Sequence, residues 1–268
     1  AAGAASIKMA SDFNESLNKV DVSFKSASGS VTDFAKTSLK TYGIASGTAL
    51  DMASNFGDMA TSMGLGVGEA AKLSTSLVGL AGDLSSFKNI NIKEATTALN
   101  GIFTGETESL KRLGIVMTEA NVKAFALSQG FTKQYDAMTQ AEKVLLRYNY
   151  VMSVTKNAQG DFARTNEGAA NQMRMFGEGM KQLSGQIGQV MLPAFTSVVS
   201  SLNDMIAGFS DSSQGTKTFI VALAGITAGV GPLLFLVGTI VPKVIEGFNL
   251  MSAAAVKFNL TLKGAASI

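Results

Sequence analysis

The most acidic stretch of the chain is the first place where catalysis has to be considered. Glu106, Glu108 and Glu119 lie close together in the sequence, and paired carboxylates are what general acid and base catalysis uses. Lys111 and Arg112 follow at helical spacing, which brings them alongside the glutamates as ordinary ion pairs. A catalytic pair needs burial to shift its pKa values, and this context does not indicate burial. We therefore interpret these acids as a solvated helix surface.

A glycine-rich run at residues 64–68, GLGVG, resembles a phosphate-binding loop in composition. A dinucleotide-binding turn needs G-x-G-x-x-G after a strand, and a P-loop needs GxxxxGK[ST]; neither occurs here. The run instead follows a predicted helix, where glycine supplies the left-handed residue that ends a helix. We predict a helix end and a connector.

The composition excludes most familiar enzyme classes. The 268 residues include no histidine and no cysteine, so a His-dependent triad, a His/Cys zinc site, a disulfide and a thiol nucleophile are impossible. We expect no enzyme activity, no cofactor and no metal. Charged residues make up only 16%, against about 25% in typical soluble domains. Either the chain associates extensively, or part of it meets lipid.

The positive charge has no pattern that suits nucleic-acid binding. The sequence carries 22 Lys+Arg and 20 Asp+Glu, and residues 217–268 hold 4 of the basic and 1 of the acidic side chains. No clustered basic stripe accompanies them, so specific DNA or RNA binding is not expected. This basic excess suits the flanks of a membrane-seeking segment. The chain also opens without an initiator Met or a signal peptide, which indicates a piece of something longer.

Apolar residues recur at steps of three and four almost everywhere, which predicts an all-α molecule. The expected architecture is a multi-helix core, then a long heptad-like helix, then a hydrophobic helix or helical hairpin. The five expected stretches are N-terminal helices (1–60), a helical core (61–172), a heptad-patterned helix with a linker (173–216), a hydrophobic membrane-competent segment (217–247) and an amphipathic C-terminal tail (248–268).

Three apolar patterns define the first helices. The first helix is expected over 7–28, ended by the Ser-Gly-Ser run at 28–30, with a second helix from about Ser30. Two further helices are expected from stripes at helical spacing, which most simply pack in a core. These stripes are Met52, Phe56, Met59 and Met63, and then Leu73, Leu77, Leu80 and Leu84.

A longer stripe of six apolar residues steps three, four, three, four, three, as in alternating a and d positions of a coiled coil. Its members are Met173, Phe176, Met180, Leu183, Ile187 and Val190. Such a stripe needs a partner helix, either within the same chain or in parallel copies of it. Four glycines interrupt it, each costing about 1 kcal/mol relative to alanine in a helix interior. Close packing through small residues would offset that cost.

Residues 218–242 form 25 consecutive uncharged positions between Lys217 and Lys243. About 20 such residues cross a bilayer, so the run is long enough for a membrane span. Pro232 lies mid-segment, however, and favours a hairpin of two shorter buried helices as the alternative. The expected membrane-contact residues are Phe219, Ile220, Val221, Leu223, Ile226, Leu233, Leu234, Phe235, Leu236, Val237 and Ile240.

Several short runs carry a resemblance to a known family. They are 105–115 (GETESLKRLGI), 117–120 (MTEA), 139–143 (TQAEK), 147–149 (RYN), 159–165 (QGDFART), 170–174 (ANQMR), 192–194 (LPA) and 231–234 (GPLL). In this order the chain resembles, over roughly 60–245, the core of tail tape measure proteins of tailed bacteriophages and prophages. None of the runs is catalytic, so the resemblance concerns a structural role.

The resemblance implies a protein that fills the tail lumen, helps to set tail length and is released on infection. The expected partners are other copies of the chain, tail tube and tail-tip or baseplate proteins, and the host inner membrane on ejection. Genomic DNA would pass by without specific binding. The expected location is the virion tail lumen, and the host membrane after ejection. A membrane-active pore-forming effector with a helical solubilising domain is the alternative.

Overall fold

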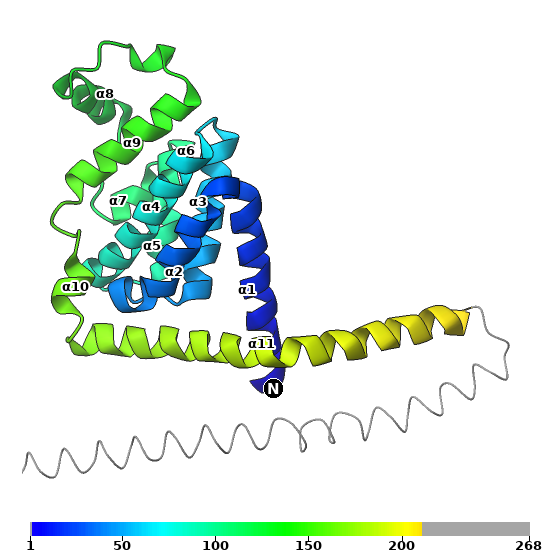
Figure 1. Cartoon of the computed structure of the whole chain (residues 1–268). Helices are drawn as coiled ribbons and strands as arrows, with labels where there is room; N and C mark the ends of the chain where they lie inside the picture. The colour runs from blue at the N-terminus through cyan, green and yellow to red at the C-terminus, as the bar shows by residue number, and fades with distance from the viewer. Residues whose placement is uncertain (1, 211–268) are drawn as a thin grey trace, which may run out of the picture. The chain divides into compact units, whose positions relative to one another are not determined.

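The computed structural model describes residues 2–210 and confirms the all-α fold, because these residues contain helices and no strand (Figure 1). The predicted hydrophobic segment and C-terminal tail lie outside the described residues. The helices are α1 (Ala2–Phe24), α2 (Ser28–Tyr42), α3 (Ser46–Ser62), α4 (Val67–Lys88), α5 (Ile92–Leu99), α6 (Gly101–Thr104), α7 (Glu108–Arg112), α8 (Glu119–Ser128), α9 (Gln140–Val154), α10 (Asp161–Thr165) and α11 (Ala169–Ser210), with 3-10 turns η1 (Lys25–Ala27) and η2 (Tyr135–Ala137).

Residues 1–196 form one compact unit, which contains the helical body. In this body α3 and α4 lie at the centre, with α1, α2, α5 and α10 packed around them (Figure 1). The predicted stripe on α4 is buried throughout: Leu73, Leu77, Leu80 and Leu84 are each at most 3% exposed. One core cluster includes residues from Val20 to Ala158, so the stretches 1–60 and 61–172 share a single core.

The boundary between the first two helices differs from the prediction. The break comes at Lys25, which has a φ of 47°, and the chain passes through η1 before α2 begins at Ser28. The Ser-Gly-Ser run is therefore the first turn of α2 and not the end of a helix. Ser and Gly are compatible with the first turn of a helix as well as with its end, so composition alone cannot separate the two.

Glycine is required where α2 meets α10. Gly43 ends α2 with a φ of 66°, in the left-handed region, and a Cβ there would lie 2.5 Å from the Phe162 ring. The first three residues of the GLGVG run form the predicted helix end and connector, where Gly64 has a φ of 97°. The last two residues differ from the prediction, because α4 already begins at Val67.

The α8–α9 segment joins the core through polar contacts. The Arg147 guanidinium donates to the carbonyl oxygens of Ile102 and Phe103 at 3.2 and 3.0 Å and to the Tyr135 hydroxyl at 3.0 Å. These carbonyls belong to the last turns of α6, which cannot bond them internally. Arg147 therefore fixes α9 against the end of α6.

A buried carboxylate joins α10 to α4. Asp83 lies on α4 and is 5% exposed, and its two oxygens accept hydrogen bonds from the main-chain N–H groups of Gly160 and Phe162 at 2.7 and 3.2 Å. These groups are at the start of α10, where an anion is favoured. Next to it, the Ser86 hydroxyl donates to Asp161 at 2.6 Å. The chain is thus held on α4 shortly before α11 begins.

Candidate functional site

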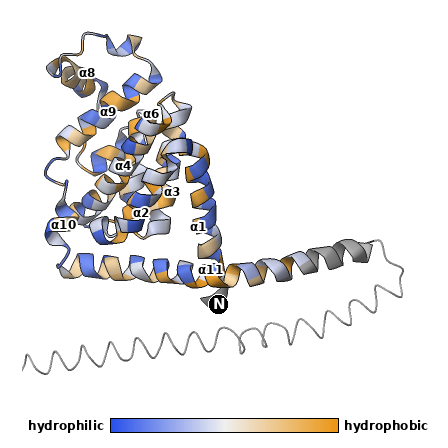
Figure 2. Ribbon diagram, in the orientation of Figure 1, coloured by the Kyte–Doolittle hydropathy of each residue, from blue (hydrophilic) through white to orange (hydrophobic). Residues whose placement is uncertain are grey.

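The six residues of the predicted helix-association stripe lie on α11, and the body of the same chain leaves them open. Met173 and Phe176 are 71% and 66% exposed, and the others range from 41% to 63%. We call Met173, Phe176, Met180, Leu183, Ile187 and Val190 the apolar stripe. Figure 2 shows hydrophobic residues alternating with hydrophilic ones along α11.

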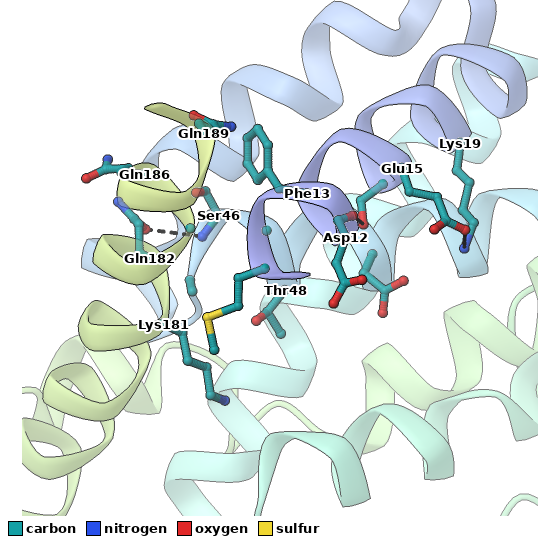
Figure 3. Close-up of a pocket in the computed structure, with 16 residues that line it drawn as sticks. Asp12, Phe13, Glu15, Lys19, Ser46, Thr48, Lys181, Gln182, Gln186 and Gln189 are labelled. Carbon is teal, nitrogen blue, oxygen red and sulfur yellow. Dashed lines mark hydrogen bonds and ion pairs between the residues drawn. The ribbon is translucent and has the colours of Figure 1, made fainter. Parts of the chain in front are cut away.

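The opposite side of α11 contacts the body with polar side chains. We call Asn171, Arg174, Glu178 and Gln182 the polar contact face. Glu178 Oε2 accepts from the Ala45 main-chain N–H at 3.1 Å and from the Thr48 hydroxyl at 3.3 Å. Gln182 Oε1 accepts from the Ser46 N–H at 3.2 Å, the contact drawn as a dashed line in Figure 3.

These two contacts cap the start of α3. Its N-cap residue is Ala45, which has no side-chain acceptor, so the first N–H groups of α3 lack a local partner. Glu178 and Gln182 supply the acceptors from α11. The Glu178 side chain is only 8% exposed, and its negative charge also suits the positive end of the α3 dipole.

A second pair of contacts fixes the first turn of α11 to the end of α4. Arg174 Nη2 donates to the Ser85 carbonyl oxygen at 2.9 Å, and Arg174 Nη1 donates to Asn171 Oδ1 at 2.8 Å. Asn171 in turn donates to the Ser86 hydroxyl at 2.8 Å. Burial lowers the pKa of the Arg174 guanidinium, and the nearby Glu178 carboxylate opposes this effect.

Further along, α11 and α1 approach closely at a glycine. A Cβ at Gly188 would lie 1.8 Å from the Ser6 carbonyl oxygen and 2.9 Å from the Ala10 Cβ. Gly177, by contrast, has nothing within 4 Å of such a Cβ. Close packing through small residues therefore accounts for Gly188 and not for Gly177.

The α11 helix is therefore docked with its polar side toward the body and its apolar side away from it. A surface helix in a globular protein normally buries its apolar stripe. Of the two partners that the sequence leaves open, a helix of the same chain does not cover the stripe within residues 2–210. The accessible apolar surface of α11 is the strongest candidate for a functional site.

A cavity of about 430 Å³ lies between α1, the start of α3 and α11 (Figure 3). Its charged groups are mostly engaged: Asp12 pairs with Lys8 at 2.6 Å, and Glu15 pairs with Lys19 at 3.2 Å. In Figure 3, Phe13 and Gln189 lie at one end and Lys181 at the other. This lining does not assemble a nucleophile with a base.

The three glutamates considered for catalysis lie apart from this cavity and are exposed. Glu108 pairs with Lys111, and Glu119 pairs with Lys123 at 2.6 Å. Hydrogen bonds from the Ser109 hydroxyl and the Glu108 N–H lower the pKa of Glu106. A general acid needs a raised pKa, which Glu106 does not have. Glu108 and Glu119 lie on a solvated helix surface as interpreted, whereas Glu106 lies in the loop before α7.

The titratable group that the sequence did not reveal is Asp83. Burial raises its pKa, the hydrogen bonds from Gly160 and Phe162 lower it, and Asp161 adds a smaller upward effect. Perturbed carboxylates often mark active sites. Here both oxygens are occupied by backbone donors, so a folding role accounts for the group. In the sequence, the only signal for this buried carboxylate is the position of an aspartate within an otherwise apolar helix.

Among residues 2–210, no group of acidic side chains is arranged to hold a metal ion, and no helix is long and apolar enough to cross a membrane. The predicted membrane-contact residues, from Phe219 to Ile240, lie outside this part of the chain.

No protein-family model, characterised protein sequence or solved structure matches the chain.

Proposed function

We propose that this chain is part of a phage tail tape measure protein, with a structural and delivery role and no catalytic turnover. The observation that carries the proposal is the arrangement of α11: a helical body is fixed to a 42-residue helix whose apolar stripe faces away from it. A protein that packs beside its own copies and beside tube proteins needs such a surface.

The runs that resemble the family support a structural reading, because several lie at joints of the fold. Arg147, in the RYN run, bonds the carbonyls at the end of α6. Asp161, in the QGDFART run, accepts from Ser86 on α4. Asn171 and Arg174, in the ANQMR run, fix the start of α11. These residues hold helices together, which suits a scaffold.

The helical geometry also suits a position near one end of a tape measure protein. An α-helix rises about 1.5 Å per residue, so the part of α11 that belongs to the first unit, residues 169–196, spans about 42 Å. The body formed by α1 to α10 is too compact to measure length itself. We place it near one end of a longer helical protein in the tail lumen, close to tail-tip or baseplate proteins, with genomic DNA passing by unrecognised.

The membrane step of the proposal concerns residues 218–242. On release, this uncharged run would insert in the host inner membrane and aid DNA passage. Liposome flotation and dye leakage would be compared between the full chain and a variant lacking 217–243. We expect binding by the full chain alone, and equal binding by both would exclude this step. Strong leakage by a chain that is absent from tail particles would favour the pore-forming effector instead.

The tape measure role can be tested in phage particles whose genome encodes this chain. Antibody labelling and mass spectrometry of purified tails should find the chain protected from added protease until ejection is triggered, and digestible afterwards. An in-frame insertion in a helical region of the same open reading frame should lengthen the tail by about 1.5 Å per residue. Absence from the tail, or unchanged tail length, would contradict the proposal.

A further inference from the structure

We infer that the apolar stripe of α11 is an interface with the same stripe on a second copy of this chain. The inference gives a surface to the self-association named among the proposed partners, and to that extent it rests on the proposed function. Its evidence lies in α11 itself.

The apolar stripe has the seven-residue period of a coiled-coil surface. A three-four alternation keeps apolar residues in line only when the partner helix has the same seven-residue period. Among the residues whose exposure the structure describes, the other exposed large apolar side chains are scattered over α1, α4, α8, α9, connecting loops and the far part of α11 and form no stripe: Val22, Phe87, Val116, Leu127, Phe131, Val154 and Phe195. The matching surface in this part of the chain is therefore α11 of another copy.

The apolar stripe is sterically accessible to a second copy of the chain. The polar contact face holds the body on the side of α11 opposite the stripe, through Glu178, Gln182 and Arg174. Two copies can then meet stripe to stripe while each body points away from the contact. Such an isologous contact closes on itself and needs no rearrangement of either body.

The residues that flank the apolar stripe also suit an identical partner helix. The flanking positions, which would carry interhelical charges in a coiled coil, are Gln172, Gly177, Gly179, Ser184 and Gln186. None is charged, so two identical helices meet without like-charge repulsion. Gly177 has no neighbour among the described residues that would explain a glycine, and a closely approaching partner helix would provide one.

The stripe covers only two and a half heptads, so the association is expected to be weak and to depend on concentration. Sedimentation velocity on the full chain, over a range from about 1 µM to 1 mM, measures it directly. The disrupting variant is M180E with I187E, which places two charges within the contact. The control is Q189E, which adds one such negative charge at an exposed position off the stripe.

We expect the full chain and the Q189E variant to associate alike, and the M180E/I187E variant to need at least about tenfold higher concentration. A second variant, M173L with M180L, keeps the stripe apolar and should retain association. Helix content by circular dichroism checks that all variants fold. A wild-type chain that stays monomeric at 1 mM, or equal association of the disrupting variant, would overturn the inference.

These results are independent of those in tail particles. A chain that does not pair but is incorporated normally into tails would contradict the inferred interface and would still support the proposed function. A chain that pairs but is absent from tails would support the inferred interface and would contradict the proposed function.

Discussion

Glu178 accepts a hydrogen bond from the main-chain N–H of Ala45 at 3.1 Å, although 133 positions separate the two residues. Ala45 is the N-cap residue of α3 and has no side-chain acceptor of its own, so Glu178 of α11 supplies the missing acceptor. The start of a central helix of the body therefore depends on a side chain of α11. This relationship connects the stability of the core to the docking of the helix that carries the apolar stripe.

The Glu178→Ala variant should lower the free energy of unfolding by about 1–2 kcal/mol, because it removes a helix cap and leaves a backbone donor unpaired. Glu178→Gln keeps one acceptor oxygen and should cost less. Urea denaturation followed by circular dichroism measures both. Glu167→Ala, at an exposed position, is the matched control. Equal stability of the Glu178 and Glu167 variants would show that the cap does not stabilise α3.

Two glycines on α11 should respond to alanine in opposite directions. Gly188→Ala places a Cβ against the Ser6 carbonyl oxygen of α1 and should cost about 1–3 kcal/mol through overpacking. Gly177→Ala meets nothing within 4 Å and should add up to about 1 kcal/mol through helix propensity. Thermal melts at low protein concentration, where chains stay apart, compare the two. Stabilisation by both would mean that α1 and α11 are not in close contact.

The first four helices of the body could be predicted from the sequence, apart from the boundary between α1 and α2, because they follow one rule. Apolar residues at steps of three and four lie on one face, and on α4 that face is buried, as Leu77 and Leu84 show. The same rule identifies the stripe on α11 but not its direction. Periodicity tells which residues share a face, whereas the partner of that face depends on contacts made elsewhere.

The polar contact face could not be predicted for the same reason. In the sequence, Glu178 and Gln182 have the spacing of a solvated face, and nothing near them shows that α3 lacks a cap. Asp83 is a similar case, because its partners Gly160 and Phe162 are far along the chain and donate through the backbone. Side-chain type carries no information about such donors. The contacts that join these helices are therefore apparent only in the structure.

The Arg147→Lys variant tests whether the α8–α9 segment depends on a single guanidinium. A lysine keeps the charge but cannot reach the two carbonyl oxygens and the Tyr135 hydroxyl together. We expect a loss of about 1–3 kcal/mol, which for a chain of this size lowers the melting temperature by about 2–4 °C per kcal/mol. Arg112→Lys, at an exposed position, is the control. Equal melting of the two variants would assign α9 docking to its apolar contacts alone.

The buried carboxylate of Asp83 should give stability a pH dependence that Asp83→Asn removes. Burial raises the pKa of Asp83 above its ordinary value of 3.8, so the folded chain keeps this proton at a pH where the unfolded chain has released it. Between the two pKa values, the free energy of unfolding therefore falls as the pH rises, and above the folded pKa this contribution is constant.

Because Asn does not titrate, the wild-type chain should lose stability relative to Asp83→Asn as the pH rises from 3.8 through that window. Urea denaturation of both proteins at several pH values gives the difference, in which the other carboxylates cancel. Asp58→Asn, which removes an exposed carboxylate from α3, is the matched control. A difference that grows with pH would mean that the hydrogen bonds from Gly160 and Phe162 outweigh burial, so that the charged form of Asp83 is what holds α10 on α4.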